Sequence, residues 1–199
     1  MHRLCVLVSG NGTTLQAIID SIDRGELEAS IAAVISSRPD AYALTRASRH
    51  GIEAIALDFR KSGQKQYDEM LYEILVALSP DLICLAGYLR ILDARTVRHF
   101  VGRIVNTHPA LLPSFGGKGM YGDRVHDAVL KSGARKSGCS VHFVTEGIDT
   151  GPVILQASVP VKKGDTVREL AARVHDAELK AYPEAIRLVL EGKAVFSGA

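Results

Sequence analysis

Short apolar runs alternate with amphipathic stretches through the first half of the chain, and this order restricts the fold more than any other feature. The apolar runs occupy residues 4–8, 31–35, 53–57, 82–85 and 104–105. They lack clean polar alternation, which is typical of parallel strands that are covered on both faces. Helical spacing fills residues 13–22, 40–50, 66–78 and 93–101. The order predicts a doubly wound α/β fold with a mostly parallel, Rossmann-like sheet.

The second half of the chain changes character. A helix is expected over residues 123–131, followed by strands at 140–144 and 152–161 that the turn between them joins as a β-hairpin. A long C-terminal helix is expected to begin near Thr166, because Thr166 and Glu169 have the spacing of a capping box. We expect this helix to run toward Gly192, with a kink at Pro183.

Composition fits one ordinary domain spanning residues 1–199, with 47% apolar and 23% charged residues. The formal net charge of +2, without a basic block, argues against a nucleic-acid partner. No apolar stretch approaches the ~20 residues that a bilayer requires, so we expect no membrane partner and a cytoplasmic protein. Cys5, Cys84 and Cys139 lie in apolar runs and are expected to be reduced core thiols. No residues have metal-site spacing.

A glycine-rich loop, Ser9 to Thr14, follows the first predicted strand and opens the first predicted helix. Backbone amides at such a helix start can hold an anion, and phosphate is the natural ligand. The alternative is a tight turn with a threonine cap. The loop is not G-x-G-x-x-G, and no acidic residue ends the second strand, which argues against a dinucleotide. Arg38 leaves an NADP-type site open, because it could face a 2′-phosphate.

Three polar side chains have the chemistry for acyl transfer. Asn106 and His108 lie at the end of the fifth predicted strand, and Asp149 lies in the turn of the predicted hairpin. Ligands of open α/β sheets bind at the carboxyl ends of the strands, and residues two apart on a strand face the same side. An amide can polarise a carbonyl, an imidazole can move a proton, and a carboxylate can orient the imidazole. His142 is the other histidine to weigh, and we interpret it as a structural residue with a hydrogen bond.

The segment Gly116 to Gly122 is too rich in glycine to be a regular element. A mobile loop beside a catalytic strand end can close over a substrate, so Gly117, Lys118 and Gly119 are candidates for a lid. The sequence fits an irregular surface connection without a lid function equally well.

With Asn106, His108–Pro113 and the later Asp149, the chain resembles the folate-dependent formyltransferases. Further ordered matches lie at Ser9–Gly12, Leu85–Leu92, Gly138–Val144 and Gly151–Gln156. The resemblance covers nearly the whole chain. It implies transfer of the formyl group of 10-formyltetrahydrofolate, as cosubstrate, to the amine of glycinamide ribonucleotide in purine biosynthesis. It implies no tightly bound cofactor and no metal, and leaves open a monomer or a homodimer.

The same resemblance assigns roles to residues. It makes Asn106, His108 and Asp149 catalytic. From the chemistry of these groups we expect Asn106 and a protonated His108 to donate to the developing oxyanion, and Asp149 to raise the proton affinity of the ring. The charge of His108 at rest stays open. Ribonucleotide-binding roles fall on Gly12, Thr13, Thr14, Pro109, His175 and Glu178. Folate-binding roles fall on Asn106, Leu89, Arg90, Ile91, Leu92, Val144, Thr145, Glu146, Gly147 and Ile148. Residues 1–100 would then form a phosphate-binding half, and residues 101–199 a catalytic and folate-binding half.

This chain departs from the family pattern at two binding positions. Thr13-Thr14 stands where many members have Ser-Asn, which weakens the expected phosphate contact of Thr14. Gln64 stands where an arginine is common, which weakens a contact to the folate tail.

Three other functions compete with this interpretation. Related enzymes formylate methionyl-tRNA or hydrolyse the formylfolate with the same three groups, but most of them carry an extra domain, for which 199 residues leave no room. A non-catalytic nucleotide-binding domain would use the Gly12 loop alone and would leave Asn106, His108 and Asp149 unexplained.

Overall fold

A computed structural model of the chain describes residues 1–198. Its seven strands form one sheet in the order β3-β2-β1-β4-β5-β6-β7, and a helix follows every strand except β6, which leads directly into β7. In chain order the elements are β1 (His2–Val8), α1 (Thr13–Asp23), β2 (Ala29–Ser36), α2 (Tyr42–Arg49), β3 (Ala54–Ala56), α3 (Phe59–Leu78), β4 (Leu82–Leu85), α4 (Ala94–His99), β5 (Ile104–His108), α5 (Asp123–Lys131), β6 (Lys136–Phe143), β7 (Val153–Pro160) and α6 (Val167–Leu190). The predicted α/β fold is confirmed. The chain divides into two compact units, the first ending at Val105 and the second beginning at Asn106.

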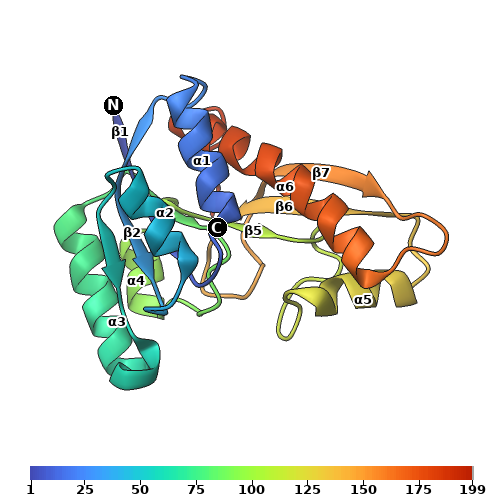
Figure 1. Cartoon of the computed structure of the whole chain (residues 1–199), viewed down its shortest axis with the longest axis horizontal. Coiled ribbons are helices and arrows are strands. Elements are labelled where there is room, and N and C mark those ends of the chain that lie inside the picture. Colours follow the sequence, from blue (N-terminus) through green and yellow to red (C-terminus); the bar gives the residue numbers. More distant parts are fainter. Residues whose placement is uncertain (199) are drawn as a thin grey trace. The chain divides into compact units, whose positions relative to one another are not determined.

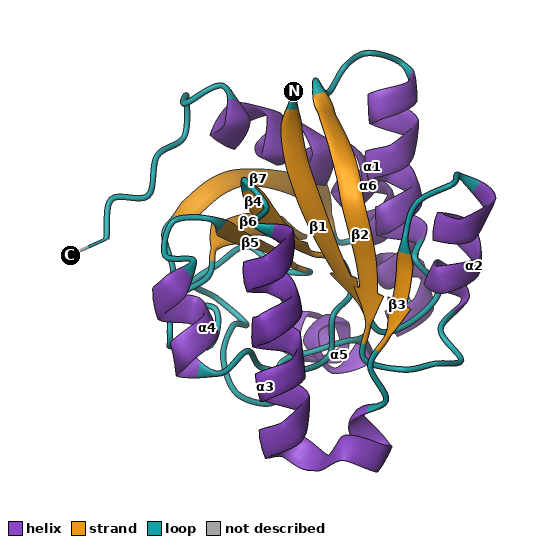
Figure 2. Ribbon diagram, turned by 90° about the vertical axis from the view of Figure 1, so that its left-hand side faces the viewer, coloured by secondary structure: helices purple, strands orange, loops and turns teal. Residues whose placement is uncertain are grey.

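In the first unit, β1 is the central strand. It pairs in parallel with β2 and β4, so that Val6 lies opposite Val34 on one side and Cys84 on the other. Residues Leu4 to Val8 are fully buried, which explains the apolar run without polar alternation. Figure 2 shows α1 and α2 on one side of these strands and α3 and α4 on the other, the doubly wound arrangement that the sequence predicts.

In the second unit, β6 and β7 form the predicted antiparallel hairpin, with Ser140 opposite Gln156. Helix α6 packs against both strands and against α5 (Figure 1). Its N-cap Thr166 forms the predicted capping box with Glu169. The helix is one element through the buried Pro183.

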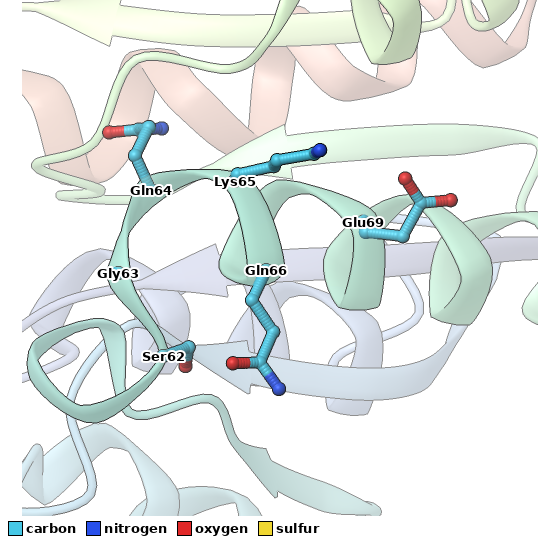
Figure 3. A pocket seen from close by; sticks show the side chains of 6 residues that line it. All are labelled: Ser62, Gly63, Gln64, Lys65, Gln66 and Glu69. Carbon is cyan, nitrogen blue, oxygen red and sulfur yellow. The ribbon is translucent and has the colours of Figure 1, made fainter.

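Helix α3 differs from the prediction. It begins at Phe59 rather than Gln66, after the N-cap Asp58, whose carboxylate accepts from the amide of Arg60. At Gly63, φ is 74° and ψ is 167°, so the helix consists of two pieces joined at a bend. Figure 3 shows the extended chain at Gly63 between these pieces. Gly63 interrupts the apolar periodicity near the start of the helix. The sequence therefore did not predict the first piece, which precedes Gly63.

The buried face of α3 consists of side chains spaced one helical turn apart. Tyr67, Leu71 and Leu75 are buried, whereas Ile74 and Leu78 lie at its margin. Among residues 1–198, no helix combines the length and apolar character that crossing a membrane requires.

Candidate active site

Strand β5 carries the first two candidate catalytic residues. It extends to His108, three residues beyond the apolar run that predicted it, so Asn106 and His108 are strand residues with one residue between them. The side chain of His108 is buried, with 3% of the residue exposed. Alternation along the strand places Asn106 and His108 on the same face, as predicted.

His108 lies between two acceptors. Its Nε2 donates a hydrogen bond to the carbonyl of Phe115 at 2.7 Å, and its Nδ1 lies 3.4 Å from Oδ2 of Asp149. The prediction that His108 and Asp149 meet is therefore confirmed by distance, although they are 41 positions apart in the sequence.

The sequence leaves the resting charge of His108 open, and that charge depends on how deeply the ring is buried. Burial lowers the pKa of His108, and the opposing effects of Asp149 and the Phe115 carbonyl do not restore it to its ordinary value. Burial therefore holds the pKa of His108 below that of an ordinary histidine, which favours the neutral imidazole at rest. The sequence placed a carboxylate beside the ring but could not show how far the ring is removed from water.

Asp149 is held as a carboxylate. Burial acts to raise its pKa, but the polar groups around the carboxylate, among them the Gly117 amide and the rings of His142 and His108, together lower it. The Gly117 amide donates to Oδ2 at 3.0 Å. Asp149 has a positive φ of 56°, as does Phe115 at 57°. Left-handed backbone at two non-glycine residues marks a site whose surroundings hold an unfavourable conformation.

His142 belongs to this cluster, which the sequence did not predict. Its Nδ1 donates to the carbonyl of Phe143 at 2.8 Å, which leaves Nε2 to accept from the Asn106 amide at 3.2 Å. Nε2 also lies 3.6 Å from Oδ1 of Asp149. The hydrogen bond fits the structural role expected of His142, but its partners are two candidate catalytic groups. Its only sequence signal was a polar residue in an apolar strand.

A brace of hydrogen bonds holds the segment that follows His108. Oγ of Ser140 donates to the carbonyl of Ala110 at 2.6 Å and accepts from the amide of Leu112 at 2.9 Å. Gln156 donates to the Leu112 carbonyl at 2.9 Å and to Ser140 Oγ at 2.8 Å. Ser140 is therefore a fully buried bracing residue in a core strand and not an exposed nucleophile.

The glycine loop after this segment contacts the cluster through its backbone. A Cβ on Gly116 would lie 2.5 Å from Leu112 Cδ2, so a side chain there would require Leu112 to shift. Gly117 binds Asp149, whereas Lys118 and Gly119 are exposed. The structure thus brings Gly117, but not Lys118, to the candidate catalytic groups. A lid role for the loop stays a prediction.

The candidate phosphate loop lies in the first unit. Gly12 is the N-cap of α1, with φ at 74°, and no side chain caps this helix by a hydrogen bond. The alternative interpretation, a tight turn capped by threonine, is therefore wrong about the cap. A Cβ on Gly12 would lie 2.7 Å from Ala43 Cβ, so the loop and α2 approach closely only because residue 12 is glycine. Thr13 and Thr14 open the helix, and Thr14 is buried.

Arg38, which left an NADP-type site open, is engaged elsewhere. Its guanidinium forms an ion pair with Asp40 at 2.6 Å and a second hydrogen bond to it at 3.0 Å. A 2′-phosphate would have to compete with this bidentate pair. The dinucleotide alternative loses its main support.

The candidate folate residues form two exposed segments, one in each unit. In the first, Leu89 and Ile91 are 64% and 66% exposed, while Leu92 is buried and Arg90 stacks on Phe59 at 3.8 Å. In the second, Val144 and Thr145 are half-buried, and Glu146, Gly147 and Ile148 are exposed. Exposed apolar side chains are available to an apolar ring system.

The remaining candidate ribonucleotide contacts are in the second unit. His175 and Glu178 lie one turn apart on α6, with Nδ1 3.9 Å from Oε2. The neighbouring Glu178 carboxylate raises the pKa of His175. Pro109 is half-buried directly after His108.

An open groove of about 520 Å³ lies at the bend of α3, away from the candidate catalytic residues in the sequence (Figure 3). The residues that line it are Ser62, Gly63, Gln64, Lys65, Gln66 and Glu69. The amide of Gln64 donates to both carboxylate oxygens of Asp68 at 2.8 Å. Gln64 is therefore engaged within its own helix.

Cysteine and metal chemistry find little support. All three cysteines are buried and free, and burial raises the pKa of Cys5 to about 12 and that of Cys139 to about 11. Within residues 1–198, no three His, Cys, Asp or Glu side chains gather as metal ligands.

Comparisons with known proteins show what the whole chain is similar to. The formyl transferase family model matches residues 2–186. Phosphoribosylglycinamide formyltransferase of Escherichia coli is 40% identical over 196 residues, which cover 96% of this chain and 88% of that protein. The crystal structure of glycinamide ribonucleotide transformylase 1 from Symbiobacterium toebii is 46% identical, has a TM-score of 0.92, and is matched over 100% of this chain and 92% of that one.

A trifunctional purine biosynthetic protein adenosine-3 of Gallus gallus is 42% identical over 191 residues. These residues are 96% of this chain but only 18% of that protein, so the chain spans less than a fifth of this relative. The match over nearly the whole chain shows the family: this chain is a member of the formyl transferase family.

Proposed function

We propose that this chain transfers the formyl group of 10-formyltetrahydrofolate to the amine of glycinamide ribonucleotide, as a step of purine biosynthesis. The observation that carries the proposal is the cluster of Asn106, His108 and Asp149, in which the Nδ1 of the buried His108 lies 3.4 Å from the Asp149 carboxylate. The names of the E. coli and S. toebii relatives support the choice of acceptor.

In the proposed reaction, the substrate amine attacks the formyl carbon, and negative charge develops on the formyl oxygen. The Asn106 amide, oriented by its hydrogen bond to His142, donates to that oxygen. The new C–N bond forms as the bond from the carbon to the folate nitrogen breaks. The amine loses one proton and the folate nitrogen gains one, so the products are the formylated amine and tetrahydrofolate.

The protonation states at the site support a role for His108 in moving that proton. A neutral imidazole can accept the proton that the attacking amine releases. The Asp149 carboxylate, which stays ionised, then stabilises the imidazolium until the proton passes to the leaving nitrogen. Metal ions and covalent acyl-enzyme intermediates have no part in this proposal.

We propose the binding roles as the family resemblance assigns them. The phosphate of the ribonucleotide would bind at Gly12, Thr13 and Thr14, with Pro109, His175 and Glu178 as further contacts. The exposed segments at 89–92 and 144–148 would bind the folate. A single formyltransferase domain would then span residues 1–199, with phosphate binding in residues 1–100 and catalysis and folate binding in residues 101–199.

The experiment that tests this function supplies 10-formyltetrahydrofolate and glycinamide ribonucleotide to the purified chain and follows both products by mass spectrometry. We expect formylated ribonucleotide and tetrahydrofolate in equal amounts. Formate release without ribonucleotide would favour hydrolysis, and formylation of methionyl-tRNA in place of the ribonucleotide would favour the tRNA enzyme. Binding of nucleotide without either product would favour the non-catalytic alternative.

We also propose that the enzyme acts in the cytoplasm on these two small molecules, as a monomer or a homodimer. No nucleic acid or membrane takes part. The modest net charge of +2 supports this proposal. Light scattering of the purified chain with and without substrates distinguishes the two oligomeric states.

A further inference from the structure

Helix α2 binds two successive carbonyls of the candidate phosphate loop. The amide of Ala43 donates to the carbonyl of Gly10 at 3.1 Å. The Nε of Arg46 donates to the carbonyl of Asn11 at 2.9 Å. The loop is therefore held by the helix that follows the next strand, through one backbone and one side-chain donor.

These two bonds set the direction of the loop amides. In a planar trans peptide, the carbonyl and the N–H point in opposite directions. Because the carbonyls of Gly10 and Asn11 face α2, the N–H groups of Asn11 and Gly12 point away from it. Amides that point together from a glycine loop at a helix start form the kind of concavity that binds phosphate.

Arg46 is itself held in place along the loop. Its Nη1 donates to Oε1 of Gln16 at 3.2 Å, and its guanidinium lies 5.0 Å from the centre of the Tyr42 ring. Its Cδ lies 3.4 Å from the position that a Cβ on Gly12 would occupy. The acceptors of both hydrogen bonds are neutral amide oxygens, so these bonds leave the positive charge of Arg46 beside the loop.

We propose that Arg46 is a positioning residue for the phosphate of the ribonucleotide. It turns the Asn11 carbonyl away, which directs the Gly12 amide toward the phosphate, and its charge attracts the dianion without direct contact. The inference rests on the proposed function, because it concerns the phosphate of that substrate. It adds a residue from α2 to a site otherwise assigned to the loop and to α1.

The test compares Arg46→Met and Arg46→Lys with the matched control Arg49→Met. Arg49 lies on the same helix and against the same Tyr42 ring, at 5.7 Å, and donates to the Tyr42 hydroxyl. Each variant is assayed for the KM of glycinamide ribonucleotide, the KM of the formylfolate and kcat. Binding of ribose 5-phosphate, measured by calorimetry, reports on the loop without turnover.

We expect Arg46→Met to raise the ribonucleotide KM by about tenfold or more, with kcat at saturation and the folate KM within about twofold of wild type. Ribose 5-phosphate binding should weaken by a similar factor. Arg46→Lys keeps the positive charge, but a lysine lacks the planar guanidinium that reaches both the Asn11 carbonyl and Gln16 Oε1. Its ribonucleotide KM should therefore lie between those of wild type and Arg46→Met. Arg49→Met should match wild type.

Equal ribonucleotide KM values for Arg46→Met and Arg49→Met, in a wild type that turns over, would overturn the inference and leave the proposed function intact. A fall in kcat without a change in KM would overturn it as well. Absence of turnover in the wild type would instead count against the proposed function, and the calorimetric comparison would still decide the role of Arg46 at the loop.

Discussion

At the scale of single residues, the environment of each group determines the chemistry more than its identity does. The pKa values of His108 and Asp149 are both lowered, but for different reasons: burial lowers that of His108, whereas the polar groups around Asp149 together outweigh the burial that acts to raise its pKa. The sequence predicted both residues because their motif is recognisable. It did not predict the protonation state of His108, which depends on burial by segments distant in the sequence.

The pH dependence of catalysis follows from that lowered pKa. If neutral His108 accepts the proton, kcat/KM falls as pH falls through the pKa of His108 in the free enzyme. The acid limb should therefore lie below 6.5, the ordinary value for histidine. Because the charge of Asp149 raises the pKa of His108, Asp149→Asn should move the limb to still lower pH. Measuring kcat/KM over a range of pH for the wild type and for Asp149→Asn locates the acid limb of each. An acid limb of the wild type above pH 6.5 would contradict the prediction.

Gly12 gives a second prediction at this scale. Gly12→Ala should lower the free energy of unfolding by about 1 kcal/mol or more through its positive φ, and should raise the ribonucleotide KM because the new Cβ pushes against Ala43. Gly25→Ala is the matched control, with φ at 71° but no atom within 4 Å of the new Cβ. By urea unfolding we expect Gly12→Ala to be the more destabilised variant, because both carry the backbone strain but only Gly12→Ala adds the contact with Ala43. An unchanged KM in Gly12→Ala would show that the loop tolerates the displacement.

At the scale of elements, the order and type of helices and strands were predictable, whereas some bounds were not. Apolar runs predicted the five strands of the first half and helical spacing predicted its helices, because burial on both faces leaves a simple pattern. β5 was predicted too short, because its last three residues, Asn106 to His108, are polar and do not continue the apolar run. The first piece of α3 was missed, because Gly63 interrupts the period.

The capping box of α6 carries a prediction for stability. Thr166→Ala removes the acceptor of the Glu169 amide and the cap of a 24-residue helix, which should cost about 1 kcal/mol. Thr45→Ala, at an exposed interior position of α2, should change stability by less than about 0.5 kcal/mol. Urea unfolding of the three proteins measures the difference. Equal stability of the two variants would mean that the capping box contributes nothing to the folded state.

At the scale of the whole molecule, the family was predictable from ordered motifs along nearly the entire chain, and the comparisons confirm it. The fold is confirmed with it. The roles of individual binding residues stay predictions, because a motif match gives a position and not a contact. His142 illustrates the limit: its sequence context was that of a core strand, and only the structure brings it to Asn106 and Asp149.

The central claim is that the Asn106, His108 and Asp149 cluster performs formyl transfer to the ribonucleotide amine. The direct measurement is kcat for formylation of glycinamide ribonucleotide by the wild type, Asp149→Asn and the exposed control Asp127→Asn. We predict turnover by the wild type and Asp127→Asn at equal rates, and a loss of about 10²-fold or more in kcat for Asp149→Asn. Full kcat in Asp149→Asn, with a folded protein, would contradict the account.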